Sequence, residues 1–408
     1  MTIRRALTAA WLASLAIGCR SGKAKSDAGV AAQGQLDASA LASDGGVGST
    51  APELFASPAS RCGQCHGAFE AQWRASAHAR SESAPAYVAM RSHADAAACD
   101  GCHAPLDRML APDDPAQHDG VNCDVCHTMS DVTPRKSGGG FVLHVDDMTK
   151  YGPLCDAKNN YFHKVSCSPL HARSEMCAAC HLMYTRTPSQ DLPVFTEYEE
   201  WQASRYGAID QTCQDCHMPE QASAVAVGAK RRGGVARHDF GASDPHFRAG
   251  ALTVRASLDD HDGALVVHAT LRNDGAGHSV PTGLPERRVV LRVTTFDDAN
   301  KRVDRVERAY GRVLVDAQGL PAPFYEAARV GSDTRLKVDE QRDESIPLSI
   351  ATAGQVQVDV VWQPMAPDIA SKLEVPLQEV VLQHGVTRIE APARRRAGTA
   401  PIRMAVVP

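Results

Sequence analysis

One short cysteine motif occurs five times in the chain, and this repeat constrains the fold more than any other feature. In every copy two cysteines stand three positions apart, and a histidine directly follows the second. The copies are Cys62-Cys65-His66, Cys99-Cys102-His103, Cys123-Cys126-His127, Cys177-Cys180-His181 and Cys213-Cys216-His217. A cysteine pair alone also suits a zinc half-site, a redox dithiol or a disulfide framework, but none of these requires the histidine. The complete motif predicts five covalently attached c-type haems.

The motif spacing has a chemical cause. Two thiols three positions apart can add to the two vinyl groups of one haem, and the adjoining imidazole then coordinates the iron. The five copies lie within the 156 residues from Cys62 to His217, where large apolar side chains are scarce. The porphyrins must therefore supply much of the core in this stretch. We expect the haems to pack close together, as an electron relay requires.

The N-terminal residues are typical of a secretory leader. Arg4 and Arg5 precede an apolar stretch, Ala6 to Ile17, that is too short to span a bilayer. The sequence ending at Gly18-Cys19 resembles a bacterial lipoprotein box, in which Cys19 would carry the lipid. We expect a signal peptide over 1–19 and a flexible linker over 20–54, which is rich in Ala, Gly, Ser and Asp. A leader cleaved elsewhere explains the same composition.

Export to an oxidising compartment also bears on the remaining cysteines. Cys155 and Cys167 belong to no motif, and a mutual disulfide is their simplest use there. We expect a periplasmic or outer-membrane-associated protein, touching the membrane only through a lipid at Cys19. The formal charge of -5 gives no indication of a nucleic-acid partner.

The residue pattern changes after about residue 250, where cysteines no longer occur and apolar residues alternate with polar ones. Such alternation predicts strands. The runs are Leu265 to Leu271, Arg288 to Phe296, Arg312 to Asp316, Ser345 to Ile350 and Gln355 to Trp362. In the first run His268 lies on the face opposite the apolar side chains, so we expect it to be exposed. The sequence predicts an α+β multidomain chain: a mainly helical, loop-rich pentahaem domain over 55–250 with little strand, then an antiparallel β-sandwich over 251–408.

The first motif also resembles a known family. Cys62 to His66 is followed by Gln72-Trp73-Arg74-Ala75-Ser76-Ala77-His78-Ala79. This order looks like the cytochrome c-554-type domain of multihaem cytochromes, where W-x-x-S-x-H-A follows the motif. Weaker matches extend the resemblance over roughly residues 60 to 290. They are Gly120 to Cys123, Ser168 to His171, Cys213 to Pro219, Arg237 to Phe240 and Gly277 to Gly283.

Each iron needs a second axial ligand, and twelve histidines lie outside the motifs. The resemblance implies four of them as distal ligands: His78, His171, His238 and His278. The fifth position stays open among His163, His246 and His118, with His93 and His144 behind them, and we favour His246. One haem can instead keep an open site.

Two functions remain open on the sequence. The first is electron transfer outside the cytoplasm, between redox partners such as other cytochromes or a membrane quinol-oxidising complex. The alternative is an oxidoreductase that reduces or oxidises a small nitrogen or sulfur compound at one open haem. Related pentahaem nitrite reductases carry Lys in place of His in the motif of their catalytic haem, whereas all five motifs here keep His. We therefore favour a carrier and assign no catalytic residue.

Overall fold

The structure is a computed structural model that describes residues 56–187, 190–261, 264–350, 352–391 and 397–407. The described residues all belong to one compact unit. The expected signal peptide, the linker and Cys19 lie outside the described residues. Because the described residues form one compact unit, the division into two domains at residue 250 remains a prediction. Residues 56–250 are called the motif half, and residues 251–407 are called the sandwich.

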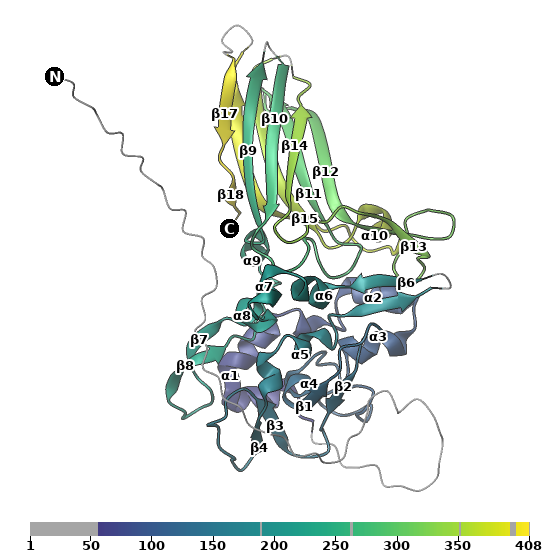
Figure 1. Cartoon of the computed structure of the whole chain (residues 1–408), viewed down its shortest axis with the longest axis vertical. Helices are drawn as coiled ribbons and strands as arrows, with labels where there is room; N and C mark the ends of the chain where they lie inside the picture. Colours follow the sequence, from purple (N-terminus) through teal and green to yellow (C-terminus); the bar gives the residue numbers. More distant parts are fainter. Residues whose placement is uncertain (1–55, 188–189, 262–263, 351, 392–396, 408) are drawn as a thin grey trace, which may run out of the picture. The chain divides into compact units, whose positions relative to one another are not determined.

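The motif half consists of short helices joined by loops and small hairpins (Figure 1). Its helices are α1 (Ala59–Ala75), η2 (His78–Arg80), α2 (Pro85–Arg91), α3 (Ala96–His103), α4 (Cys123–His127), η3 (Pro169–Ala172), α5 (Glu175–Ala178), α6 (Glu197–Gln202), α7 (Arg205–Ala208), α8 (Cys213–His217) and α9 (Pro245–Ala249). Its strands are β1 (Met129–Val132), β2 (Phe141–Leu143), β3 (Thr149–Gly152), β4 (Lys164–Cys167), β5 (Met183–Arg186), β6 (Asp191–Phe195), β7 (Glu220–Ala224) and β8 (Arg231–Ala236).

These strands correct the expectation of little strand before residue 250. They form two-stranded sheets, β1 with β2, β3 with β4, β5 with β6 and β7 with β8. The pair β3 and β4 is parallel and the others are antiparallel. Loops between haem motifs still need partners for their backbone N–H and C=O groups, and a porphyrin offers few, so short pairings supply them. Cys155 and Cys167 are disulfide-bonded, as predicted.

The sandwich contains two antiparallel sheets. One has the order β14-β10-β9-β17 and the other β13-β12-β11-β15-β16-β18. The elements are β9 (Leu252–His261), β10 (Ala264–Asn273), β11 (Arg288–Asp297), β12 (Arg302–Val315), β13 (Arg329–Asp333), β14 (Gln341–Pro347), β15 (Gly354–Gln363), α10 (Pro367–Lys372), β16 (Val380–Ile389), β17 (Gly398–Ile402) and β18 (Ala405–Val406). The predicted fold class, helices and loops followed by a sheet-rich region, is confirmed.

Strand β10 shows why alternation was a reliable guide in the sandwich. Leu265, Val267, Ala269 and Leu271 are all at most 5% exposed, and they join one core with side chains of both sheets. His268 points to the other face and is exposed there, where its ring lies 3.0 Å from the Ser345 hydroxyl. The prediction for this strand is confirmed, because period-two alternation places successive side chains on opposite faces.

A smaller apolar cluster joins the two halves. Met90 of α2 packs with Met365 and with Ile369 of α10, and Leu284 and Phe324 border the cluster. Among the residues that the structure describes, no helix combines the length and the apolar character needed to cross a lipid bilayer.

Candidate functional site

Most motif cysteines lie on or beside short helices whose first turns are capped by side chains. Asp95 accepts a hydrogen bond from the amide of Ala97 at the start of α3. Asn122 accepts bonds from the amides of Asp124 and Val125 at the start of α4. Thr212 and Asp215 form a reciprocal capping box on α8. Such caps satisfy amides that a helix of one or two turns leaves unpaired, so they hold the two thiols and the histidine of a motif in one orientation.

The motif histidines are oriented through their Nδ1 atoms. His66 Nδ1 lies 2.6 Å from the carbonyl oxygen of Val225, and His127 Nδ1 lies 2.7 Å from that of Tyr151. His103 and His217 make the same contact with Ser81 and Phe240, at 2.8 and 3.0 Å. A carbonyl can only accept, so Nδ1 carries the proton and Nε2 keeps its lone pair. This is the tautomer that coordinates a metal through Nε2.

Four motif histidines each face a second histidine ring. Two imidazoles that bond one iron from opposite sides at about 2 Å hold their ring centres roughly 6 Å apart. The ring centres of the pairs lie 6.2, 6.4, 6.2 and 6.2 Å apart for His66 with His163, His181 with His78, His127 with His238, and His217 with His278. The separations suit one iron between each pair.

Burial keeps several of these rings neutral. It lowers the pKa of His78 to about 3, and the charge of His181 acts in the same direction. Burial likewise lowers the pKa of His217 and of His238 to about 4. A neutral imidazole is the form that binds a metal ion, so the buried rings remain competent ligands at neutral and mildly acidic pH.

His171 was expected to be a distal ligand, and the structure places it differently. Its ring centre lies 5.7 Å from that of His127, which also faces His238. Its Nε2 is 2.8 Å from the carbonyl oxygen of Cys126, and its Nδ1 is buried without a partner among the described residues. Because Nε2 donates to this carbonyl, the lone pair of His171 lies on its buried Nδ1. Both His171 and His238 thus face His127, and we pair His127 with His238 because their separation of 6.2 Å equals that of two other pairs.

The favoured fifth ligand, His246, is also in a different place. It is an exposed residue of α9, and only His163 of the contested candidates faces a motif histidine. His93 is exposed, and His144 Nδ1 lies 3.8 Å from Asp146. His163 belongs to the segment between the disulfide partners Cys155 and Cys167, a link that constrains the loop and that the sequence already suggested.

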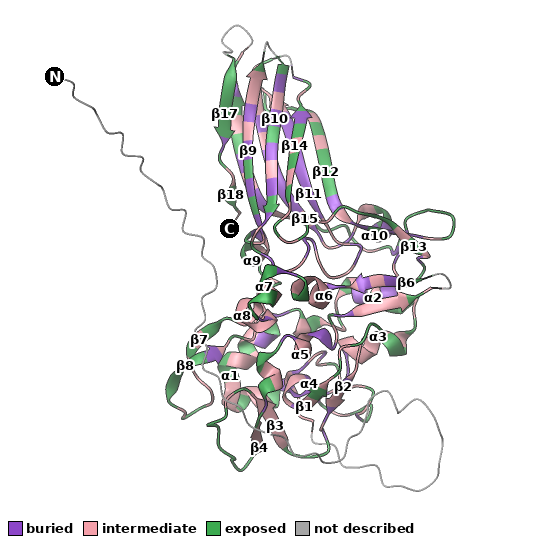
Figure 2. Ribbon diagram, viewed as in Figure 1, coloured by how far each residue is buried: buried purple, intermediate pink, exposed green. Residues whose placement is uncertain are grey.

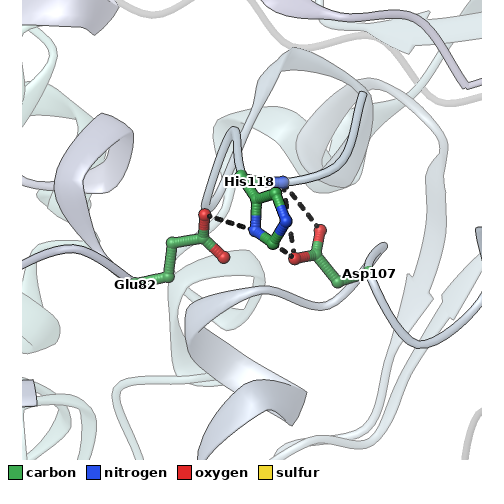
Figure 3. Close-up of side chains that lie close together, drawn as sticks. All are labelled: Glu82, Asp107 and His118. Carbon is green, nitrogen blue, oxygen red and sulfur yellow. Dashed lines mark hydrogen bonds and ion pairs between the residues drawn. The ribbon is translucent and has the colours of Figure 1, made fainter. Parts of the chain in front are cut away.

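His118, the remaining contested candidate, contacts two carboxylates instead (Figure 3). Its Nδ1 lies 3.4 Å from Glu82 Oε1 and 3.6 Å from Asp107 Oδ2, and its side chain is 77% exposed. Burial, and next the charge of Asp107, raises the pKa of Glu82. The three side chains tie the loop at His118 to the turn at Glu82, directly after Ser81, whose carbonyl oxygen orients His103. None of these three side chains faces a motif histidine, but the cluster holds the turn whose Ser81 carbonyl orients His103.

His103 is the exception among the motif histidines. Among the described residues its ring contact is with Tyr87, whose ring stacks on it at 4.2 Å, and not with a histidine. Burial, rather than any ion pair, is the main cause of its lowered pKa. Tyr87 itself is held by a hydrogen bond to Asp100, which Arg91 also pairs. The second motif, Cys99 to His103, therefore offers a proximal imidazole but no facing imidazole in the described part of the chain.

Motifs that are distant in sequence are neighbours in space. The thiols of Cys62 and Cys123 lie close enough to shift each other's pKa, and the same holds for Cys102 with Cys180 and for Cys177 with Cys213. The first motif thus adjoins the third, the second adjoins the fourth, and the fourth adjoins the fifth. Haems attached to these sulfurs would have neighbouring macrocycle edges close together.

The residues present fit haem c. Ten thiols stand in pairs, backbone carbonyls orient four of the motif imidazoles, and four opposing imidazoles lie at the separation that iron requires. When bound, haem supplies an iron that changes its charge by one electron. The chain supplies the axial ligands, the low-polarity surroundings and the spacing between centres.

Comparison with known proteins agrees with this geometry. The family described as cytochrome c554 and c-prime matches residues 61–128, which include the first three motifs. Residues 61–128 therefore resemble this cytochrome family at the place where the sequence itself indicates a multihaem c-type cytochrome. The resemblance to multihaem cytochromes that was seen at the first motif is confirmed. The cofactor is haem c, and the class of function is haem-mediated electron transfer. No curated protein matches the cytochrome.

A solved structure extends the likeness beyond the matched region. The penta-haem cytochrome c552 from Thermochromatium tepidum superposes on the cytochrome with a TM-score of 0.68 at 21% sequence identity. The match covers 83% of this chain and all of the other. Because 83% exceeds the share of the motif half, the shared fold includes sandwich strands. At this identity the comparison concerns fold alone.

Proposed function

We propose that the cytochrome carries five haem c groups and passes electrons through them outside the cytoplasm. The observation that carries this proposal is the set of four imidazole pairs, each with a motif histidine on one side and a distant histidine on the other. Two imidazoles per iron give a six-coordinate centre that exchanges electrons without binding substrate. Four such centres in a row favour a relay over a catalyst.

The thiol contacts support an order for this relay. The first haem adjoins the third through Cys62 and Cys123, and the fourth adjoins both the second and the fifth. Cys126 of the third motif is close enough to Cys177 and Cys180 to raise their pKa values, after the larger effects of neighbouring thiols and burial. The proposed path runs from the first haem through the third to the fourth, where it branches to the second and the fifth.

An extracytoplasmic place accounts for two further features. Cys155 and Cys167 form a disulfide, and disulfides persist in oxidising compartments. The leader-like N-terminus and the lipoprotein-box resemblance at Cys19 suggest a periplasmic or outer-membrane-associated protein held by a lipid. Its partners are then other redox proteins, such as cytochromes or a membrane quinol-oxidising complex.

The haem count and ligation can be measured together. A pyridine haemochrome assay on the purified holoprotein is expected to give five haems per chain. Low-temperature EPR and magnetic circular dichroism of the oxidised protein are expected to show at least four low-spin bis-histidine centres. A haemochrome count of three or fewer, or methionine-to-iron charge-transfer bands at several centres, would contradict the proposal.

A second function is favoured by one observation: within the described ranges of the chain, no imidazole faces His103. An iron without a sixth protein ligand can bind a small molecule, so this haem suits an oxidoreductase acting on a nitrogen or sulfur compound. Arg287 lies close enough to influence the pKa of His103, although burial has the larger effect, and its Nε is buried without a partner among the described residues. A guanidinium there would attract an anionic substrate.

Carbon monoxide separates the two functions. Six-coordinate bis-histidine haems exclude it, whereas an open ferrous haem binds it. One equivalent of bound carbon monoxide per chain, together with nitrite- or sulfite-induced spectral shifts, would favour the oxidoreductase. No binding to the reduced holoprotein would leave electron transfer as the function.

A further inference from the structure

The loop that carries His278 connects the two sheets of the sandwich. It runs from the end of β10 to the start of β11, and the sandwich holds its backbone tightly. Asn273, which is fully buried, donates from Nδ2 to the carbonyl oxygen of His278 at 2.9 Å. Val280 and Leu336 exchange two backbone hydrogen bonds, each 2.9 Å long. The sandwich therefore fixes the loop on both sides of the histidine.

The motif half holds the same loop from the other direction. Glu200 of α6 accepts a hydrogen bond from the backbone amide of Ser279 through Oε2, at 2.8 Å. The next residue, Trp201, donates from Nε1 to the carbonyl oxygen of Gln211 at 2.7 Å, shortly before Cys213. Two adjacent residues of α6 thus make both contacts: Trp201 holds the segment before the fifth motif, and Glu200 holds the loop that carries His278. This places α6 where it can set the separation of His217 and His278.

The Glu200 carboxylate is itself held by the sandwich. Its Oε1 accepts from Arg335 at 2.9 Å and from the Thr196 hydroxyl at 2.7 Å. Asp333 bonds Arg335 at 2.9 Å and Arg312 at 3.0 Å. The side chains of Arg312 and Arg335 are only 7% and 10% exposed, so two carboxylates balance two largely buried guanidinium groups.

Glu200 remains charged in this setting. Burial opposes ionisation, but Arg335 and the Ser279 amide outweigh it and hold the pKa of Glu200 below its usual value. Removing a carboxylate from such a network leaves buried cations and an amide without their partner, which costs more than the loss of an exposed pair.

We propose that Glu200 is a positioning residue for the haem at Cys213, Cys216 and His217: it holds Ser279 so that His278 stays at the sixth coordination site. The inference rests on the proposed function, because it takes His278 as a ligand. It assigns the sandwich a role in haem coordination, with Arg335 anchoring the carboxylate. An axial bond tolerates displacements of only about 0.5 Å, so a relaxed loop would lose it.

The test compares spin states of holoprotein variants. Glu200→Ala is expected to add a high-spin ferric signal of about one haem equivalent over wild type, and one further equivalent of carbon monoxide binding after reduction. His278→Ala should give the same increment, and the double variant should give no more, because both act on one bond. Added imidazole should restore the low-spin signal in both single variants. Glu200→Gln keeps a hydrogen-bond acceptor for the Ser279 amide, so its high-spin fraction should be smaller than that of Glu200→Ala.

The matched control is Glu379→Gln, which breaks the Arg292 ion pair within the sandwich. It is expected to lower the melting temperature without a high-spin signal. If Glu200→Ala stays fully low-spin while His278→Ala does not, the positioning role is wrong and the ligation stands. If His278→Ala itself changes nothing, the proposed ligand is wrong. Should Glu200→Ala yield no holoprotein, the signal of Glu200→Gln decides, and wild-type spectra there would overturn the role.

Discussion

The sandwich and the motif half bury their side chains in different ways (Figure 2). In the sandwich, strands β9 and β10 alternate between buried and more exposed residues, and side chains of both sheets meet in one large apolar core. The largest cluster in the motif half is smaller, and all ten motif cysteines are only half-buried. One region makes its core from its own side chains, while the other arranges its side chains around haem.

The difference shows where each region's stability comes from. Apolar burial stabilises the sandwich in proportion to the area removed from water. In the motif half, capped helices and paired imidazoles organise space that covalently bound porphyrins fill. Four measurements test this difference between the regions, and the first concerns the largest expected effect.

Chain produced without haem attachment should lose the fold of the motif half and keep that of the sandwich. We expect slow hydrogen exchange to persist in β9, β10, β11 and β15 and to disappear from the helices α1 to α8. Hydrogen exchange with mass spectrometry, with the holoprotein as reference, measures both regions at once. Equal protection in α1 and β10 of the haem-free chain would show that the comparison is wrong.

Shortening a side chain in the sandwich core should lower the free energy of unfolding without altering the haem spectrum. Leu271 is fully buried in β10, so Leu271→Ala should lower the free energy of unfolding by about 2–5 kcal/mol. Val313 is 41% exposed in β12, so Val313→Ala should change it by less than about 0.5 kcal/mol. Denaturant unfolding followed by circular dichroism compares them. A low-spin to high-spin change in folded Leu271→Ala would tie core packing to coordination directly.

Glu286, a buried carboxyl in the sandwich, should make stability depend on pH. Burial raises its pKa to about 7, so the native state holds its proton more tightly than the unfolded chain does. Its contribution is fully present below about pH 4, the unfolded pKa, and is lost as pH rises through about 7, in total about 3 kcal/mol.

Glu286→Gln should remove this pH dependence and be the more stable protein at pH 8. Exposed Glu374, changed to Gln, is the matched control and should leave the wild-type profile unaltered. Thermal unfolding from pH 5 to 8 provides the measurement. Parallel profiles for wild type and Glu286→Gln would mean that the buried carboxyl does not titrate in this range.

The smallest effect concerns a helix cap in the motif half. Asn122 is buried and caps α4, so Asn122→Ala should cost about 1 kcal/mol. Asp95 caps α3 from an exposed position, and Asp95→Ala should cost less. Melting curves recorded at a haem absorption band would rank the two variants. The reverse order would argue that burial does not control the contribution of these caps.

Local pattern predicted much of the fold. The alternating runs correspond to β10, β11, β12, β14 and β15, and His268 is exposed as expected. Helices α6 and α7 do not form one continuous helix, because the Ser204 side chain caps the amides of Tyr206 and Gly207 and starts α7 anew. The short sheets of the motif half escaped prediction, since strands of three to six residues leave little periodic signal.

The sequence by itself determined the chemistry: the five motifs specify thioether attachment and a proximal imidazole, because these depend on neighbouring residues. It could not decide which distant histidine faces which motif. His163 rather than His246 faces His66, and both His171 and His238 face His127. Those pairings join residues that lie tens to more than a hundred positions apart in the sequence. The same is true of the hydrogen bond between Glu200 and the Ser279 amide beside His278. Only packing in three dimensions decides such contacts, because no local spacing encodes them.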